Sequence, residues 1–98
     1  MLVHSVFFLL IKEATPLQRQ EFEQALHGLE QIASIREAYV GQPTISTHGA
    51  QDRSFSFALT ILFDDMASHD AYQIDSIHQQ FVRRFTPLFA NVNVYDAR

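Results

Sequence analysis

The residues of this sequence best suited to chemistry are Tyr72 and His78, which lie in the stretch 64–81. A phenol can donate a hydrogen bond to a developing oxyanion, and a neutral imidazole can remove a proton from a carbon next to a carbonyl. On one unbroken helix their spacing corresponds to a rotation of about 240°, so the two side chains could not face each other. Asp75 lies between them and is a favoured N-cap residue, so we expect one helix to end there and another to begin.

Two interpretations of this pair stay open. In the functional one, His78 is a general base, kept neutral by burial and by its place in the first turn of the second helix, where the helix dipole disfavours imidazolium. Tyr72 is then the hydrogen-bond donor. In the structural one, both side chains bond to loop backbone and fix the start of the helix. Side chains with shifted pKa values occur both at catalytic sites and in purely structural roles.

His4 is a third candidate, because it shares a face of the first predicted strand with Val6 and Phe8. If that face is turned toward the helices, His4 lies at one end of a pocket with aromatic walls. The alternative is a core histidine whose hydrogen bonds are satisfied internally. We predict a site for a small apolar or aromatic ligand, although the same residues could form an ordinary core. The predicted binding residues are His4, Val6, Phe8, Phe22, Leu26, Phe81 and Phe85.

The remaining polar residues favour neither a metal nor a cofactor. The sequence contains no cysteine, which excludes disulfides, thiolate catalysis and cysteine-based metal sites. No histidine or acidic pattern has the spacing of zinc ligands, and we interpret His27, His48 and His69 as surface residues. Asp64 and Asp65 are interpreted as a solvated strand end that caps the next helix, with a weak cation site as the alternative.

Length and charge limit the classes of function. A chain of 98 residues forms a single domain, 1–98, and its 47% hydrophobic content is ample for a core. The net charge of −4 argues against nucleic acid or an acidic membrane surface as the main partner. The apolar run 6–11 is too short to span a membrane and lacks the flanks of a signal peptide, so we expect a cytoplasmic protein.

The hydrophobic pattern predicts six main elements. They are a strand at 2–11, a helix from Thr15 to about Ala33, a strand at 35–47 interrupted near 41–43, a strand at 54–63, a helix at 76–89 preceded by a short one at 66–72, and a strand at 91–96. Phe55, Phe57, Leu59, Ile61 and Phe63 are expected on one face of the fourth element. Ile77, Phe81, Phe85 and Leu88 are expected to form the inner stripe of the last helix.

The order β-α-β-β-α-β is that of an α+β, ferredoxin-like fold, in which both main helices cover one face of a four-stranded antiparallel sheet. The first strand is apolar on both faces, so its second face also needs a cover. We therefore expect a homodimer with the two sheets packed face to face, a dimeric α+β barrel.

The arrangement of these features resembles the stress-responsive A/B barrel (Dabb) domain family. The resemblance is carried by His4 before an apolar strand, the segment YVGQP, the strand exit FSFALTILFDD, and the spacing of Tyr72, His78 and Phe81. It implies a dimeric α+β barrel. A polyketide cyclase related to the family uses a Tyr and a His that match Tyr72 and His78, and has a pocket histidine that matches His4. This chain departs from it, with Asp75-Ser76 in place of His-Pro and with Leu26 and Glu23 in place of pocket aromatics.

Three functional hypotheses follow. The first is a small-molecule-binding dimer, in its enzymatic form a cofactor-independent cyclase or isomerase that uses the Tyr72–His78 pair. The second is a stress-associated interaction module without catalysis, which the resemblance also implies. The third is a dimeric α+β barrel monooxygenase acting on quinols or haem, because such enzymes share the architecture.

Overall fold

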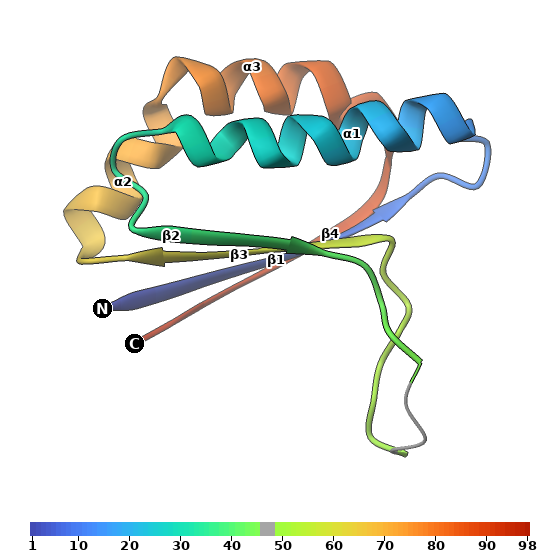
Figure 1. Ribbon diagram of the computed structural model, residues 1–98, viewed down its shortest axis with the longest axis horizontal. Coiled ribbons are helices and arrows are strands. Elements are labelled where there is room, and N and C mark those ends of the chain that lie inside the picture. Colours follow the sequence, from blue (N-terminus) through green and yellow to red (C-terminus); the bar gives the residue numbers. More distant parts are fainter. Residues whose placement is uncertain (46–48) are drawn as a thin grey trace.

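A computed structural model describes residues 1–45 and 49–98 (Figure 1). The elements in chain order are β1 (Leu2–Leu10), α1 (Pro16–Gly28), the 3₁₀ turn η1 (Leu29–Gln31), β2 (Glu37–Gly41), β3 (Phe57–Phe63), α2 (Met66–Ile74), α3 (Ser76–Phe85), the 3₁₀ turn η2 (Thr86–Leu88) and β4 (Phe89–Ala97). The predicted α+β order is confirmed. The end of the predicted second strand, residues 46–47, and His48 lie outside the described residues.

The four strands form one antiparallel sheet in the order β2-β3-β1-β4. All helices lie on one side of it, as Figure 1 shows, so the sheet has one covered and one open face. In the register of β1 and β4, Val6 stands opposite Val94 and His4 stands opposite Asp96. These pairs are turned toward the helices, and they place a histidine and a carboxylate side by side at one end of the covered face.

Helix α1 begins as its sequence predicts. The Thr15 hydroxyl accepts a hydrogen bond from the Gln18 amide at 3.1 Å, and the Gln18 side chain accepts one from the Thr15 amide at 2.9 Å. This reciprocal capping box, followed by proline at the first helical position, satisfies amides that a helix start otherwise leaves unpaired. Phe22 and Leu26 on the inner side of the helix are completely buried. Ala33, which we expected to continue this stripe, lies beyond the helix and is exposed.

The predicted break at Asp75 is confirmed. Helix α2 ends at Ile74, and the Asp75 carboxylate accepts a hydrogen bond from the Ile77 amide at 2.8 Å, which starts α3. The extended backbone of Asp75 turns the chain between the two helices. Helix α3 is shorter than predicted, because Pro87 cannot donate the next helical hydrogen bond, and the chain passes through η2 into β4. Ile77 is 40% exposed and does not belong to the inner stripe.

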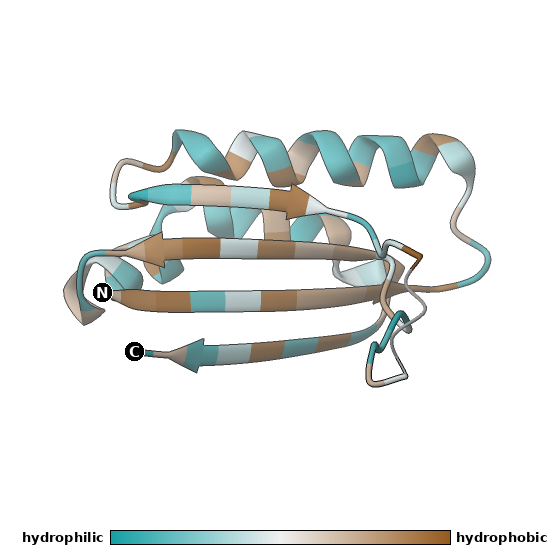
Figure 2. Cartoon of the chain, turned by 60° about the horizontal axis from the view of Figure 1, so that its bottom comes forward, coloured by the Kyte–Doolittle hydropathy of each residue, from teal (hydrophilic) through white to brown (hydrophobic). Residues whose placement is uncertain are grey.

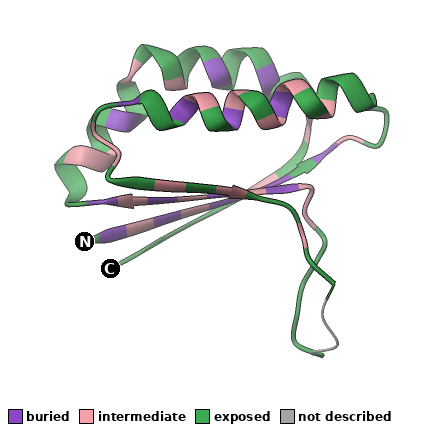
Figure 3. Ribbon diagram, viewed as in Figure 1, coloured by how far each residue is buried: buried purple, intermediate pink, exposed green. Residues whose placement is uncertain are grey.

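The core lies between the covered sheet face and the helices (Figure 3). From β3 it receives the alternate residues Phe57, Leu59, Ile61 and Phe63. The prediction that Phe55 shares this face is wrong. Ser56 bends the chain, with its hydroxyl accepting from the Leu10 amide and its own amide donating to the Phe8 carbonyl, so β3 starts only at Phe57.

The open face also carries apolar side chains, and Figure 2 shows hydrophobic residues along β1 and β3. Phe55 packs here against Phe7 with ring centroids 5.1 Å apart, and Tyr95 contacts the other side of Phe7 at 6.1 Å. With Leu9 they surround a hollow of about 290 Å³. Large half-exposed aromatic side chains on one sheet face are typical of an interface.

Replacing Asp75 by alanine should lower the free energy of unfolding by about 1 kcal/mol, because the first turn of α3 loses its cap. Urea unfolding followed by circular dichroism measures the change. Asp64→Ala is the matched control, since Asp64 forms only an exposed pair with Arg36 at 3.1 Å, worth about 0.5 kcal/mol or less. Equal losses in the two variants would contradict this role of Asp75.

Candidate functional site

A cavity of about 370 Å³ lies between the covered sheet face and the helices α2 and α3. This volume is at the small end of the range for ligand pockets, about 300–1,000 Å³. Most of its wall is apolar, with Phe8, Phe81 and Phe89 as the aromatic side chains. The polar residues of the wall are His4, Tyr72, Gln73, His78, Thr86 and Asp96.

The cavity brings most of the predicted site residues together. His4, Val6 and Phe8 from β1 line it, as do Tyr72 from α2 and His78 and Phe81 from α3. The other three predicted binding residues, Phe22, Leu26 and Phe85, do not line it and belong to the core cluster. Phe22 packs edge-on behind Phe8, with ring centroids 5.1 Å apart. Phe85 packs against the wall residue Phe81 with ring centroids 5.3 Å apart, and Phe22, Leu26 and Phe85 are all at most 3% exposed.

His78 is held in one orientation by the end of α2. Its Nδ1 lies 3.2 Å from the carbonyl oxygen of Gln73. Since a carbonyl can only accept, this contact places the proton of the neutral ring on Nδ1 and leaves the lone pair on Nε2. Burial lowers the pKa of His78, and the charge of His4 adds to this, while the Gln73 carbonyl and Asp75 act in the opposite direction. The ring is therefore neutral at pH 7.

Tyr72 lies beside His78, with ring centroids 4.4 Å apart. The side chain is 1% exposed, and burial raises its pKa above the ordinary value of a tyrosine. The phenol therefore keeps its proton. Within residues 1–45 and 49–98 the hydroxyl has no hydrogen-bond partner, so it is available as a donor toward the cavity.

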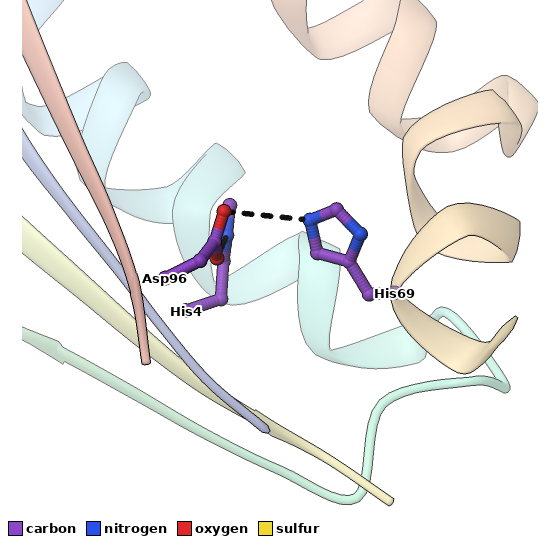
Figure 4. A group of neighbouring side chains, drawn as sticks. All are labelled: His4, His69 and Asp96. Carbon is purple, nitrogen blue, oxygen red and sulfur yellow. Dashed lines mark hydrogen bonds and ion pairs between the residues drawn. The ribbon is translucent and has the colours of Figure 1, made fainter. Parts of the chain in front are cut away.

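Two residues near the cavity were missed by the sequence analysis. His4 Nδ1 lies 2.6 Å from the Asp96 carboxylate, and His69 Nε2 lies 3.8 Å from the other oxygen of that carboxylate (Figure 4). The prediction that His69 is a surface residue is wrong, because its side chain is only 13% exposed. A signal existed for Asp96, which continues the alternation of Val92 and Val94 on one face of β4. None existed for His69, since its place depends on where α2 packs.

Other polar residues have structural roles. Asp65 caps α2, with its carboxylate accepting from the Ser68 amide at 2.8 Å, as predicted. Asp64 forms an exposed pair with Arg36. His27 is exposed, as expected, and lies 3.3 Å from Glu30. In residues 1–45 and 49–98, none of the helices combines the length and the apolar composition that a membrane span requires.

Comparison with models of known families identifies the family of this chain. The family model described as the stress responsive A/B barrel domain, Dabb, matches residues 2–98. The chain belongs to the Dabb family. This confirms the resemblance inferred from its sequence. No curated protein matches the sequence closely enough to count as a relative.

Solved structures confirm the ferredoxin-like fold. A Dabb family protein with a ferredoxin-like fold from Mesorhizobium loti is 21% identical, with a TM-score of 0.80 over 99% of this chain and 94% of that one. A dimeric ferredoxin-like protein of unknown function from Thermobifida fusca is 20% identical, with a TM-score of 0.80 over 98% and 88%. Hydroxynitrile lyase from Passiflora edulis is 18% identical, with a TM-score of 0.84 over 98% and 90%. At these identities the likeness shows the fold alone.

An NMR titration of the histidine ring protons should give His78 a midpoint below the ordinary value of about 6.5. Asp75→Asn should lower it further, because the substitution removes a charge that raises the pKa of His78 but keeps an N-cap side chain. A folded-state pKa below the unfolded one means that the unfolded chain binds the proton more readily. The neutral His78 ring therefore contributes fully to the free energy of unfolding above about pH 6.5. This contribution is lost as the pH falls through the folded-state pKa of His78. A midpoint at or above 6.5 would contradict the burial argument.

Proposed function

We propose that the cavity binds a small apolar or aromatic carbonyl compound and that Tyr72 and His78 catalyse proton transfer at the carbon next to the carbonyl. The observation that carries the proposal is the anchored His78 ring beside a buried phenol in the same cavity. Its Nδ1 lies on the Gln73 carbonyl, and its Nε2 has no hydrogen-bond partner within residues 1–45 and 49–98.

The reaction step follows from these two neutral groups. Nε2 of His78 removes a proton from the α-carbon, and the electron pair of the broken C–H bond moves to the carbonyl oxygen to give an enolate. The Tyr72 hydroxyl donates a hydrogen bond to that oxygen as its negative charge develops. Return of the proton to another carbon is an isomerisation. Attack of the enolate carbon on a second carbonyl of the same molecule is a cyclisation.

The fold and the cavity wall support this proposal. A hydroxynitrile lyase has the same fold, so the fold can carry an enzyme. The wall contains aromatic and aliphatic side chains and no lysine or arginine, which favours an uncharged ligand over a phosphate or carboxylate. Leu26 and Glu23 stand in place of cyclase-type aromatics and do not line the cavity, which argues against a polyketide chain as the ligand.

Exchange of α-protons for deuterium tests the proposal without knowledge of the natural substrate. In D₂O the protein should accelerate loss of the benzylic proton signal of phenylacetone, a small aromatic ketone, in ¹H NMR. His78→Ala should reduce the acceleration about 10²-fold or more, since it removes the base. Tyr72→Phe should reduce it about 10²-fold, since the ring stays and only the oxyanion donor is lost.

His27→Ala is the control for this experiment, because His27 is an exposed histidine on α1. It should exchange at the wild-type rate. Saturation-transfer NMR on the same samples separates binding from chemistry. If the wild type and His78→Ala exchange phenylacetone equally while both bind it, the protein is a carrier and the catalytic proposal is wrong.

We propose further that the working unit is a homodimer joined through the open sheet face. Dimeric ferredoxin-like structures occur among the relatives of this fold. In this chain the open face exposes Tyr95 by 61% and Leu9 by 39%, beside the half-buried Phe7 and Phe55. Burying these side chains against a second copy removes their apolar surface from water.

Phe7→Asp should convert the dimer to a monomer, because it places an unpaired charge in the centre of the proposed interface. Light scattering coupled to size exclusion distinguishes the 11.3 kDa chain from twice that mass. Leu17→Asp is the matched control on the outer side of α1, where Leu17 is 63% exposed, and it should remain dimeric. A monomeric wild type would refute the proposal.

A further inference from the structure

We propose that His4, His69 and Asp96 form a binding site for a divalent transition-metal ion, with Zn²⁺ as the expected ion. The three residues come from β1, α2 and β4, and one ligand atom of each lies within 4.8 Å of the others. Figure 4 shows the His69 ring from α2 facing Asp96 and His4, which lie together on the strands. Nothing in the spacing along the chain indicates the group, because only the folding of these three elements brings it together.

The donor set is chemically specific. Two imidazoles and one carboxylate suit Zn²⁺ and its neighbours among the divalent transition metals, and three protein ligands are typical of zinc sites that keep an open position. Mg²⁺ and Ca²⁺, in contrast, prefer oxygen ligands such as carboxylates and carbonyls. His4 and Asp96 also belong to the wall of the cavity, so the group borders the space in which the proposed ligand binds.

The hydrogen bond between His69 and Asp70 leaves the other ring nitrogen of His69 able to bind a metal. Its Nδ1 lies 3.1 Å from the Asp70 carboxylate, which can only accept, so the proton of the neutral ring is on Nδ1. The lone pair is then on Nε2, which is buried and has no hydrogen-bond partner among the described residues. It lies 3.8 Å from a carboxylate oxygen of Asp96. Two acceptors that face each other need a cation or a proton between them, and a carboxylate behind the imidazole is the usual support of a metal-binding histidine.

His4 completes the group from the other side of the carboxylate. Its Nδ1 and the Asp96 oxygen are 2.6 Å apart, so they share one proton. Zinc bound tetrahedrally at about 2.0–2.2 Å would hold its ligand atoms roughly 3.4 Å apart. The metal therefore replaces the shared proton, which is released, as the pair opens and His69 moves closer. Asp96 can make this adjustment, because it lies near the end of an edge strand and its side chain is 40% exposed.

The geometry also allows an ion pair without metal, in which a doubly protonated His69 lies between Asp70 and Asp96. The two states differ in a measurable way, because imidazolium does not bind Zn²⁺. His78 contributes no ligand atom to either state, so the exchange experiment with phenylacetone and the metal experiment can give opposite results.

Calorimetric titration of EDTA-treated, dialysed protein with Zn²⁺ tests the site. We expect one ion per chain with a dissociation constant in the micromolar range or below, and release of protons that varies with the buffer used. Co²⁺ in place of Zn²⁺ should give visible d–d absorption of a site of low coordination number. His69→Ala should weaken Zn²⁺ binding tenfold or more, and Asp70→Asn about tenfold through loss of the supporting carboxylate.

His27→Ala is the matched control, because His27 is an exposed imidazole beside a carboxylate, Glu30 at 3.3 Å. It should bind Zn²⁺ as the wild type does. Circular dichroism of each variant shows whether it is folded. If His69→Ala does not fold, His69→Gln takes its place in the titration. Absence of saturable binding by the wild type, or binding that the His69 variants leave unchanged, would overturn the proposal in favour of the ion pair.

Discussion

Asp75 ends one helix and begins the next, and the candidate site depends on that turn. On a continuous helix, Tyr72 and His78 would point in directions that differ by about 240°. The carboxylate of Asp75 accepts a hydrogen bond from the Ile77 amide, so α3 starts in a new direction. The centroids of the Tyr72 and His78 rings are then 4.4 Å apart. The same turn leaves the Gln73 carbonyl, near the end of α2, free to accept from His78. One capping residue thus sets the place, the orientation and the tautomer of the imidazole.

The low polarity of the cavity shifts the pKa values of Tyr72 and His78 in opposite directions. Burial raises the pKa of Tyr72 and lowers that of His78, since it disfavours the charged form of each. Both effects leave the groups neutral, the phenol as a donor and the imidazole as an acceptor. This is the combination that proton abstraction next to a carbonyl requires, and it arises without a charged residue between the two rings.

Local signals along the chain predicted much of this arrangement. The Thr15 capping box, the Asp75 break and the alternation of β3 depend on neighbouring residues, and each was found where the sequence indicated. Phe55 was misplaced because the bend at Ser56 depends on hydrogen bonds to β1, far away in the sequence. Phe22, Leu26 and Phe85 share the chemistry of the cavity wall. Only packing decides that they lie behind it.

The pairing of His4 with Asp96 shows why sequence spacing alone could not reveal the second polar group. The two residues stand opposite each other in the β1–β4 register, at opposite ends of the chain, and His69 reaches them from a helix. The group also acts on the Tyr72–His78 pair through space, since the charge of His4 lowers the pKa of His78.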